Sequence, residues 1–219
     1  MLKISLISRK LNFPEFMLLY LIIGITVLIS VYAFQNQEFL AKSLFYPYRV
    51  KHNNEYIRLV SHMFIHADWT HLIFNMFSLF FLGQILLVSF YYNFGEISSM
   101  IHFAIVYFFG GIFASLFPYA RNHENPNYTS LGASGAVSSI VFAAILWNPT
   151  MKLMMLFLPI QIPAYIFGPL YLAFEYFALR RGKGNIAHDA HIGGALFGIL
   201  YVLLIEPSKG SDFVQLIFN

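Results

Sequence analysis

Long apolar segments dominate this chain and restrict what it can fold into. Of its 219 residues, 58% are apolar and only 11% are charged, whereas a soluble domain has roughly 25% charged residues. A helix needs about 20 apolar residues to cross the ~30 Å hydrocarbon core of a bilayer. The pattern therefore predicts an all-α polytopic membrane protein with six transmembrane helices. The predicted spans are 14–34, 69–92, 98–117, 134–148, 153–178 and 190–205.

The fourth apolar segment is too short to cross a bilayer on its own. From Ser134 to Trp147 it has 14 residues and would rise only about 21 Å at 1.5 Å per residue. We therefore expect a bundle with a short central fourth helix. Its polar start would then lie below the membrane surface.

The chain is interpreted as one membrane domain with short ends. We expect a cytoplasmic N-terminal segment over residues 1–13, the six-helix domain over 14–205 and a short C-terminal tail over 206–219. The long connection 35–68 is expected to lie partly in the membrane interface. The basic start fits a signal peptide, but the apolar stretch after it is longer than usual for one. We therefore expect a retained first helix.

Composition also excludes several function classes. The chain has no cysteine, which rules out disulfides, thiolate metal sites and a cysteine nucleophile. It has no basic run interleaved with exposed aromatic residues, so nucleic acid is not an expected partner. No cofactor and no bound metal are expected.

Alternating helix directions gather polar residues at one face of the membrane. In a six-span chain the second, fourth and sixth helices cross in the same direction, so they begin on the same side. Their starts carry His71 and Asn75, then Ser134, then His191. A polar residue in an apolar helix costs free energy unless it has a role, and a serine nucleophile needs a base within hydrogen-bond reach.

Stripes of small residues predict that the fourth and sixth helices touch. Small residues recur at intervals of four in both segments, and such stripes let helix backbones approach closely in lipid. Close packing would bring the Ser134 hydroxyl to the His191 imidazole. The stripes are Gly135, Ser139 and Ala143, and Ala190, Gly194 and Gly198.

Three polar residues of the spans remain to be interpreted, namely His71, Asn75 and Glu175. His71 and Asn75 lie one helical turn apart and share a face, so both can donate hydrogen bonds to a developing oxyanion. Alone, such residues are more often polar contacts between helices. Glu175 lies near the end of the fifth segment and close to Arg180, and it is interpreted as part of an interfacial ion pair.

The assembled pattern resembles the rhomboid family of intramembrane serine proteases over about residues 55–205. The resemblance implies that Ser134 is the nucleophile and His191 the general base, and that His71, Asn75 and the Ser134 backbone N–H stabilise the oxyanion. It implies supporting roles for Arg58, His66, Gly132, Gly135, Gly194 and Gly198. The motifs that carry it are Arg58, His-Ala-Asp-Trp-Thr-His-Leu-Ile-Phe-Asn over 66–75, Gly-Ala-Ser-Gly over 132–135 and Ala-His-Ile-Gly-Gly-Ala-Leu-Phe-Gly over 190–198.

Two positions depart from the family pattern. Ser138 stands one turn after the nucleophile, where the family often has an aromatic residue stacked on the catalytic histidine. Another residue must therefore orient His191. Ile57 precedes Arg58 where tryptophan is common.

The resemblance also implies a substrate and a location. The expected partners are the lipid bilayer and single-pass transmembrane proteins, which are cut near the outer face; the sequence does not specify an oligomeric state. We expect a prokaryotic plasma membrane, cytoplasmic termini and an outward-facing Ser134. A count of basic residues opposes this orientation, with five on the inside segments and eight on the outside ones, although the basic residues before the first helix favour it.

Two alternatives from other classes remain. One is a non-catalytic rhomboid-like protein that binds transmembrane segments. The other is a His-rich metal transporter or metal-dependent enzyme, but the histidines have no carboxylate at a typical ligand interval. Those histidines are His62, His66, His71, His188 and His191.

Overall fold

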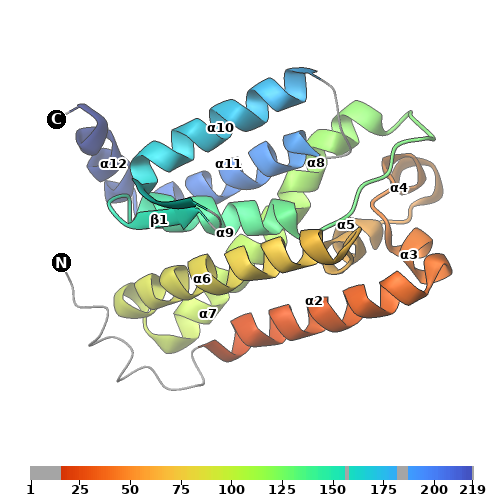
Figure 1. The fold of residues 1–219 in the computed structure, drawn as a ribbon, viewed down its shortest axis with the longest axis horizontal. Helices are drawn as coiled ribbons and strands as arrows, with labels where there is room; N and C mark the ends of the chain where they lie inside the picture. Colours follow the sequence, from red (N-terminus) through yellow and green to blue (C-terminus); the bar gives the residue numbers. More distant parts are fainter. Residues whose placement is uncertain (1–15, 156–157, 182–186, 219) are drawn as a thin grey trace.

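The computed structural model describes residues 16–155, 158–181 and 187–218. The predicted segment 1–13 and part of the basic 179–189 connection, including Lys183, lie outside these residues. The described chain is mostly helical, and its long helices lie side by side in a bundle (Figure 1). They are α2 (Met17–Gln35), α6 (Trp69–Phe94), α7 (Glu96–Ala104), α8 (Gly110–Asn122), α9 (Ser134–Trp147), α10 (Ala164–Arg181) and α11 (His188–Ile205).

Within the described ranges, four helices are long and apolar enough to cross a membrane, and the protein is an integral membrane protein. A π-helical segment, Ile105–Phe109, joins α7 to α8, so that one continuous helix runs through both. The 14-residue α9 is apolar but shorter, and α10 is not among the four, so the count of six spans stays a prediction. The four are Met17–Gln35, Trp69–Phe94, Glu96–Asn122 and His188–Ile205.

The helix directions place the polar helix starts together. In Figure 1, α6, α9 and α11 begin at one end of the bundle, where α10 ends. The start of α2 and the last helix, α12 (Ser208–Phe218), lie at the opposite end. The predicted tail therefore contains a helix.

The long connection 35–68 is built from short helices. The Asn36 side chain caps α3 by accepting a hydrogen bond from the Phe39 backbone N–H, and Pro47 begins α4, where its missing N–H costs nothing. Asp68 caps α6 in the same way through the His71 backbone N–H. The short helices are α3 (Gln37–Ser43), α4 (Pro47–Asn53), α5 (Arg58–Ser61) and the 3₁₀ turn His62–Phe64.

The predicted span 153–178 is wrong in its first part. β1 (Lys152–Met155) and β2 (Leu158–Pro163) pair in the antiparallel sense, with Lys152 opposite Pro163, and α10 begins only at Ala164. Two prolines lack the N–H that a helix interior needs, and β-branched Ile160 and Ile162 alternate with Gln161, as is typical of a strand. The all-α prediction is corrected to this extent.

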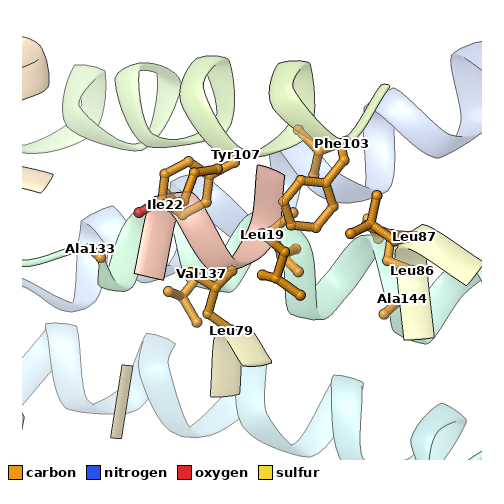
Figure 2. Packing of buried hydrophobic residues seen from close by; sticks show 14 of the residues in the cluster. Leu19, Ile22, Leu79, Leu86, Leu87, Phe103, Tyr107, Ala133, Val137 and Ala144 are labelled. Atoms are coloured by element: carbon orange, nitrogen blue, oxygen red, sulfur yellow. The ribbon is translucent and has the colours of Figure 1, made fainter. Parts of the chain in front are cut away.

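The core lies between α2, α6, α9 and the helix through 96–122. Figure 2 shows Leu19 from α2, Leu79 from α6 and Val137 from α9 meeting beneath Phe103 and Tyr107. Among lipid tails these contacts stabilise through close packing, because there is no water to expel. Every residue of α9 except Ser134 and Val141 is buried, so the predicted nucleophile lies where this central helix becomes accessible.

Candidate active site

The backbones of helices α9 and α11 lie in close contact at glycine residues. A Cβ atom added to Gly194 would lie 2.0 Å from the Gly135 carbonyl oxygen, and one added to Gly198 would lie 2.2 Å from the Ser139 carbonyl oxygen. No side chain fits at either position, so the predicted small-residue stripes do form the contact between these helices.

The same contact brings the starts of the two helices together. Gly135, which follows Ser134, lies against Ala190, which precedes His191: a Cβ on Gly135 would lie 3.6 Å from the Ala190 carbonyl oxygen. One turn further along α9, the Ser138 hydroxyl donates a hydrogen bond of 2.8 Å to the His191 carbonyl oxygen. Ser138 therefore contacts the backbone of His191.

Ser134 and His191 are both accessible from outside. The Ser134 side chain is half-buried, and the His191 side chain is 15% exposed. Over the described ranges, neither the Ser134 hydroxyl nor His191 Nε2 makes a hydrogen bond, and so none joins the two residues. Hydrogen bonds between catalytic groups are often long before substrate binds.

A carboxylate from α10 contacts the other nitrogen of His191. His191 Nδ1 lies 3.0 Å from Glu175 Oε1 and 3.4 Å from the Tyr171 hydroxyl. The second carboxylate oxygen, Oε2, lies 2.6 Å from His188 Nδ1. Glu175 is only 3% exposed, so its charge is buried among these partners.

This contact corrects the interpretation of Glu175 as an interfacial partner of Arg180. Arg180 instead donates a hydrogen bond to the Tyr176 hydroxyl on the exposed side of the helix. Residues four apart share a helix face, so Tyr171 and Glu175 face α11 while Tyr176 and Arg180 point away from it. The sequence did contain one indication that Glu175 has a functional role, because a charged residue is costly within an apolar segment.

Glu175, His188 and His191 also form the arrangement that a metal ion could use. Each offers a ligand atom, and these atoms lie within 4.8 Å of one another. No carboxylate lies at a typical ligand interval from these histidines in the sequence, but α10 supplies one in space. Both imidazoles already lie within hydrogen-bond distance of this carboxylate, which satisfies a buried charge.

His71 lies beside the segment that leads to Ser134. Gly132 has φ +118°, and a Cβ there would lie 2.6 Å from His71 Cε1. Glycine is therefore required at 132 both by the backbone and by the ring. Asn75 is buried, and its Nδ2 donates to the His71 carbonyl oxygen at 2.9 Å, which uses one of its two amide hydrogens.

His66 holds the residue that precedes Ser134. The Ser30 hydroxyl donates to the Phe64 carbonyl oxygen, so His66 Nδ1–H donates to the Ser30 oxygen at 2.9 Å. His66 Nε2 then accepts from the Ala133 N–H at 3.4 Å. Burial lowers the pKa of His66 to about 3, so the ring is neutral and keeps this arrangement.

Arg58 holds the connection 35–68 together, and His62 joins this connection to Ser115 and to Gly132. Arg58 is buried and donates to the carbonyl oxygens of Ala41 and Leu44, at 3.2 and 2.7 Å, while its Nε bonds Glu55. The neighbouring His62 lies 3.0 Å from the Ser115 hydroxyl and accepts the Gly132 N–H at its own carbonyl oxygen. Burial lowers the pKa of His62 to about 4.

The family model for the rhomboid domain matches residues 53–208. The chain belongs to the rhomboid family. The matched range includes α6, α9, α10 and α11, and with them every residue of the site described above except Ser30, Ala41 and Leu44.

Several curated relatives carry rhomboid names. RHOMBOID-like protein 12, mitochondrial, of Arabidopsis thaliana is 29% identical over 151 residues, which are 63% of this chain and 43% of that protein. The human presenilin-associated rhomboid-like protein, mitochondrial, is 32% identical over 133 residues, 59% of this chain and 35% of that protein. The Arabidopsis rhomboid-like protein 11, chloroplastic, is 28% identical over 171 residues, 71% and 55% respectively. The chain thus spans roughly half or less of the length of these relatives.

Proposed function

We propose that this rhomboid-family protein is an intramembrane serine endopeptidase in which Ser134 is the nucleophile and His191 the general base. The supporting observation is the contact between Gly135 and Gly194, which packs the start of α9 against that of α11. His191 Nδ1 is engaged by Glu175, which leaves Nε2 to accept a proton.

The proposed reaction proceeds through an acyl-enzyme. Ser134 Oγ bonds to the scissile carbonyl carbon while its proton moves to His191 Nε2 and the carbonyl electron pair moves to the oxygen. The C=O bond then re-forms, the C–N bond breaks, and the leaving amine takes the proton from Nε2. Water repeats the sequence on the ester and frees Ser134.

We assign the stabilisation of the oxyanion to three donors. The Ser134 backbone N–H lies at the start of α9, where unsatisfied N–H groups carry partial positive charge. The other two donors are the His71 ring, which lies beside Gly132, and the amide hydrogen of Asn75 that does not bond the His71 carbonyl oxygen. Preorganised donors of this kind stabilise the charge that develops on the carbonyl oxygen.

We propose that the substrates are transmembrane segments of single-pass membrane proteins, cut near the outer membrane face. The amides of a helix in lipid are already hydrogen-bonded, so the substrate must unwind before Ser134 can attack. Segments with glycine, proline or β-branched residues near the cut should unwind most readily.

The proposed topology has six crossings, with α9 and α10 as the fourth and fifth, cytoplasmic termini and Ser134 facing outward. The relatives are named mitochondrial or chloroplastic, which speaks against assuming a prokaryotic plasma membrane. In a bacterial host, a reporter active only in the cytoplasm should give signal after Asn219 and none when inserted near Asn125. The opposite pattern would overturn the orientation.

Cleavage of a transmembrane reporter tests the function. Ser134→Ala and His191→Ala should each abolish cleavage by the reconstituted protein, and the double variant should lose no more, since the two residues act as a unit. Thermal unfolding should be unchanged in each variant. Normal cleavage by Ser134→Ala would refute the assignment, and a wild-type protein that retains the reporter without cutting it would favour the non-catalytic binder.

A further inference from the structure

A buried carboxylate lies between α10 and α11. Glu175 stands in an apolar helix and is only 3% exposed. A charged residue inside a membrane protein is costly and typically serves a function. In the reaction proposed above, Glu175 engages His191 Nδ1 but neither attacks the substrate nor stabilises the oxyanion.

The geometry ties Glu175 to one nitrogen of His191. Its Oε1 lies 3.0 Å from His191 Nδ1, and its Oε2 lies 2.6 Å from His188 Nδ1. His188 and His191 lie on the same face of α11, three residues apart. Because both oxygens have partners, the carboxylate cannot rotate away from His191 without losing the contact with His188.

An ionised carboxylate only accepts hydrogen bonds. The contact therefore requires a hydrogen on His191 Nδ1 and leaves the lone pair on Nε2, the tautomer that a general base needs. When Nε2 takes a proton, the same carboxylate lies against a cation and stabilises it. Ser138 fixes the backbone of His191 through its carbonyl oxygen, so ring and backbone are held separately.

We propose that Glu175 is a positioning residue for His191, so that this protein uses a Ser134–His191–Glu175 triad. The proposal rests on the proposed protease function. Glu175 keeps its negative charge throughout: it neither takes the serine proton nor touches the substrate. It selects the tautomer of His191 and stabilises the imidazolium that forms during attack.

The alternative is that Glu175 only holds α10 against α11. The two roles differ in what they change. A purely structural contact sets how many molecules are folded and how well substrate binds, whereas a positioning contact sets the rate at each correctly folded site. The decisive quantity is therefore kcat per titrated active site.

The experiment compares Glu175→Gln and Glu175→Ala with the wild type and with Glu206→Gln. Glu206 follows the far end of α11 and its carboxylate accepts from Ser208, so it is a matched control for the same chemical change. Reconstituted proteins are titrated with a fluorophosphonate probe that labels Ser134, and cleavage of a transmembrane reporter gives kcat and KM. Glu175→Gln is isosteric, which keeps the test available if Glu175→Ala unfolds.

For Glu175→Gln we expect kcat per site to fall by on the order of 10²-fold or more, as for the carboxylate of other serine triads. KM should change less than about twofold, and probe labelling of Ser134 should slow in parallel with kcat. The loss should be at least as large in Glu175→Ala. Glu206→Gln should match the wild type.

Two results would overturn the proposal in different ways. Wild-type kcat per site in both Glu175 variants would show a structural contact only and would leave the protease intact. A wild-type protein that neither cuts the reporter nor reacts with the probe would refute the protease function and the triad with it. Histidine ¹⁵N NMR of Ser134→Ala provides a readout without activity: His191 should carry its hydrogen on Nδ1 and lose this preference when Glu175→Ala is added.

Discussion

Gly194 on α11 lies so near Gly135 on α9 that a Cβ on Gly194 would fall 2.0 Å from the Gly135 carbonyl oxygen. Since Ser134 precedes one of these glycines and His191 lies one turn before the other, the contact that packs the helices also sets the spacing of the two groups. A substitution that disrupts this contact should therefore lower both the stability and the activity of the protein.

Gly194→Ala is expected to force α9 and α11 apart. Overpacking typically costs about 1–3 kcal/mol of unfolding free energy, so the thermal unfolding temperature in detergent should fall and reporter cleavage should fall with it. Gly24→Ala is the matched control, because a Cβ on Gly24 meets nothing within 4 Å. Equal unfolding temperatures for the two variants would contradict the packing account.

Asn75→Ala is expected to lower kcat by on the order of 10²–10³-fold, the usual cost of one oxyanion donor. KM should change little, because the lost bond forms mainly in the transition state. Initial rates of reporter cleavage over a range of substrate concentrations provide the measurement. An unchanged kcat would make Asn75 a packing residue only.

Acid should destabilise the protein through His62 and His66. Burial lowers their pKa values to about 4 and about 3, whereas both bind protons near pH 6.5 in the unfolded chain. Between these values the unfolded state binds more protons, so the free energy of unfolding rises with pH. The contribution of these histidines to the free energy of unfolding should be fully present above about pH 7. It should decrease below about pH 6.5, by at most about 1.4 kcal/mol per pH unit for each histidine.

Urea unfolding at pH 7.5 and pH 5 checks this prediction. The midpoint should be lower at pH 5, and His66→Gln should show a smaller difference between the two pH values than the wild type. The same pH difference in both proteins would show that His66 is not responsible.

A chelator should leave cleavage unchanged, because the proposed reaction uses a hydroxyl and an imidazole without a metal ion. The measurement is reporter cleavage before and after dialysis against EDTA, with Ser134→Ala as the inactive reference. Loss of activity that returns with added Zn²⁺ would favour a metal bound by Glu175, His188 and His191 over the serine mechanism.

The sequence was most informative where one segment determines its own structure. The predicted 69–92 and 190–205 agree with Trp69–Phe94 and His188–Ile205, because apolar length and polar starts define such helices. The pair of strands β1 and β2 was missed because a short apolar run fits a buried helix or a strand equally well.

The contact between α9 and α11 was predicted from their small residues, but the polar contacts between distant segments could not be predicted. Whether Glu175 faces Arg180 or His191 depends on the rotation of α10 about its axis, which packing against α11 decides. Likewise, the hydrogen bond from the Ala133 N–H to His66 depends on the orientation that Ser30 of α2 gives to the His66 ring. A single sequence does not indicate which residues of distant segments pair in these two contacts.

The hydrogen bond between Glu175 and His191 joins two separate helices, so it exists only while α10 lies against α11. A molecule that binds between these helices and separates them breaks that hydrogen bond. The free energy of the bond is then subtracted from the free energy of binding. By thermodynamic reciprocity, holding His191 in its correct orientation raises the free energy needed to separate the helices by the same amount. Substrate access along this path and alignment of the base would thus be negatively coupled, and the helices would have to close again before chemistry begins.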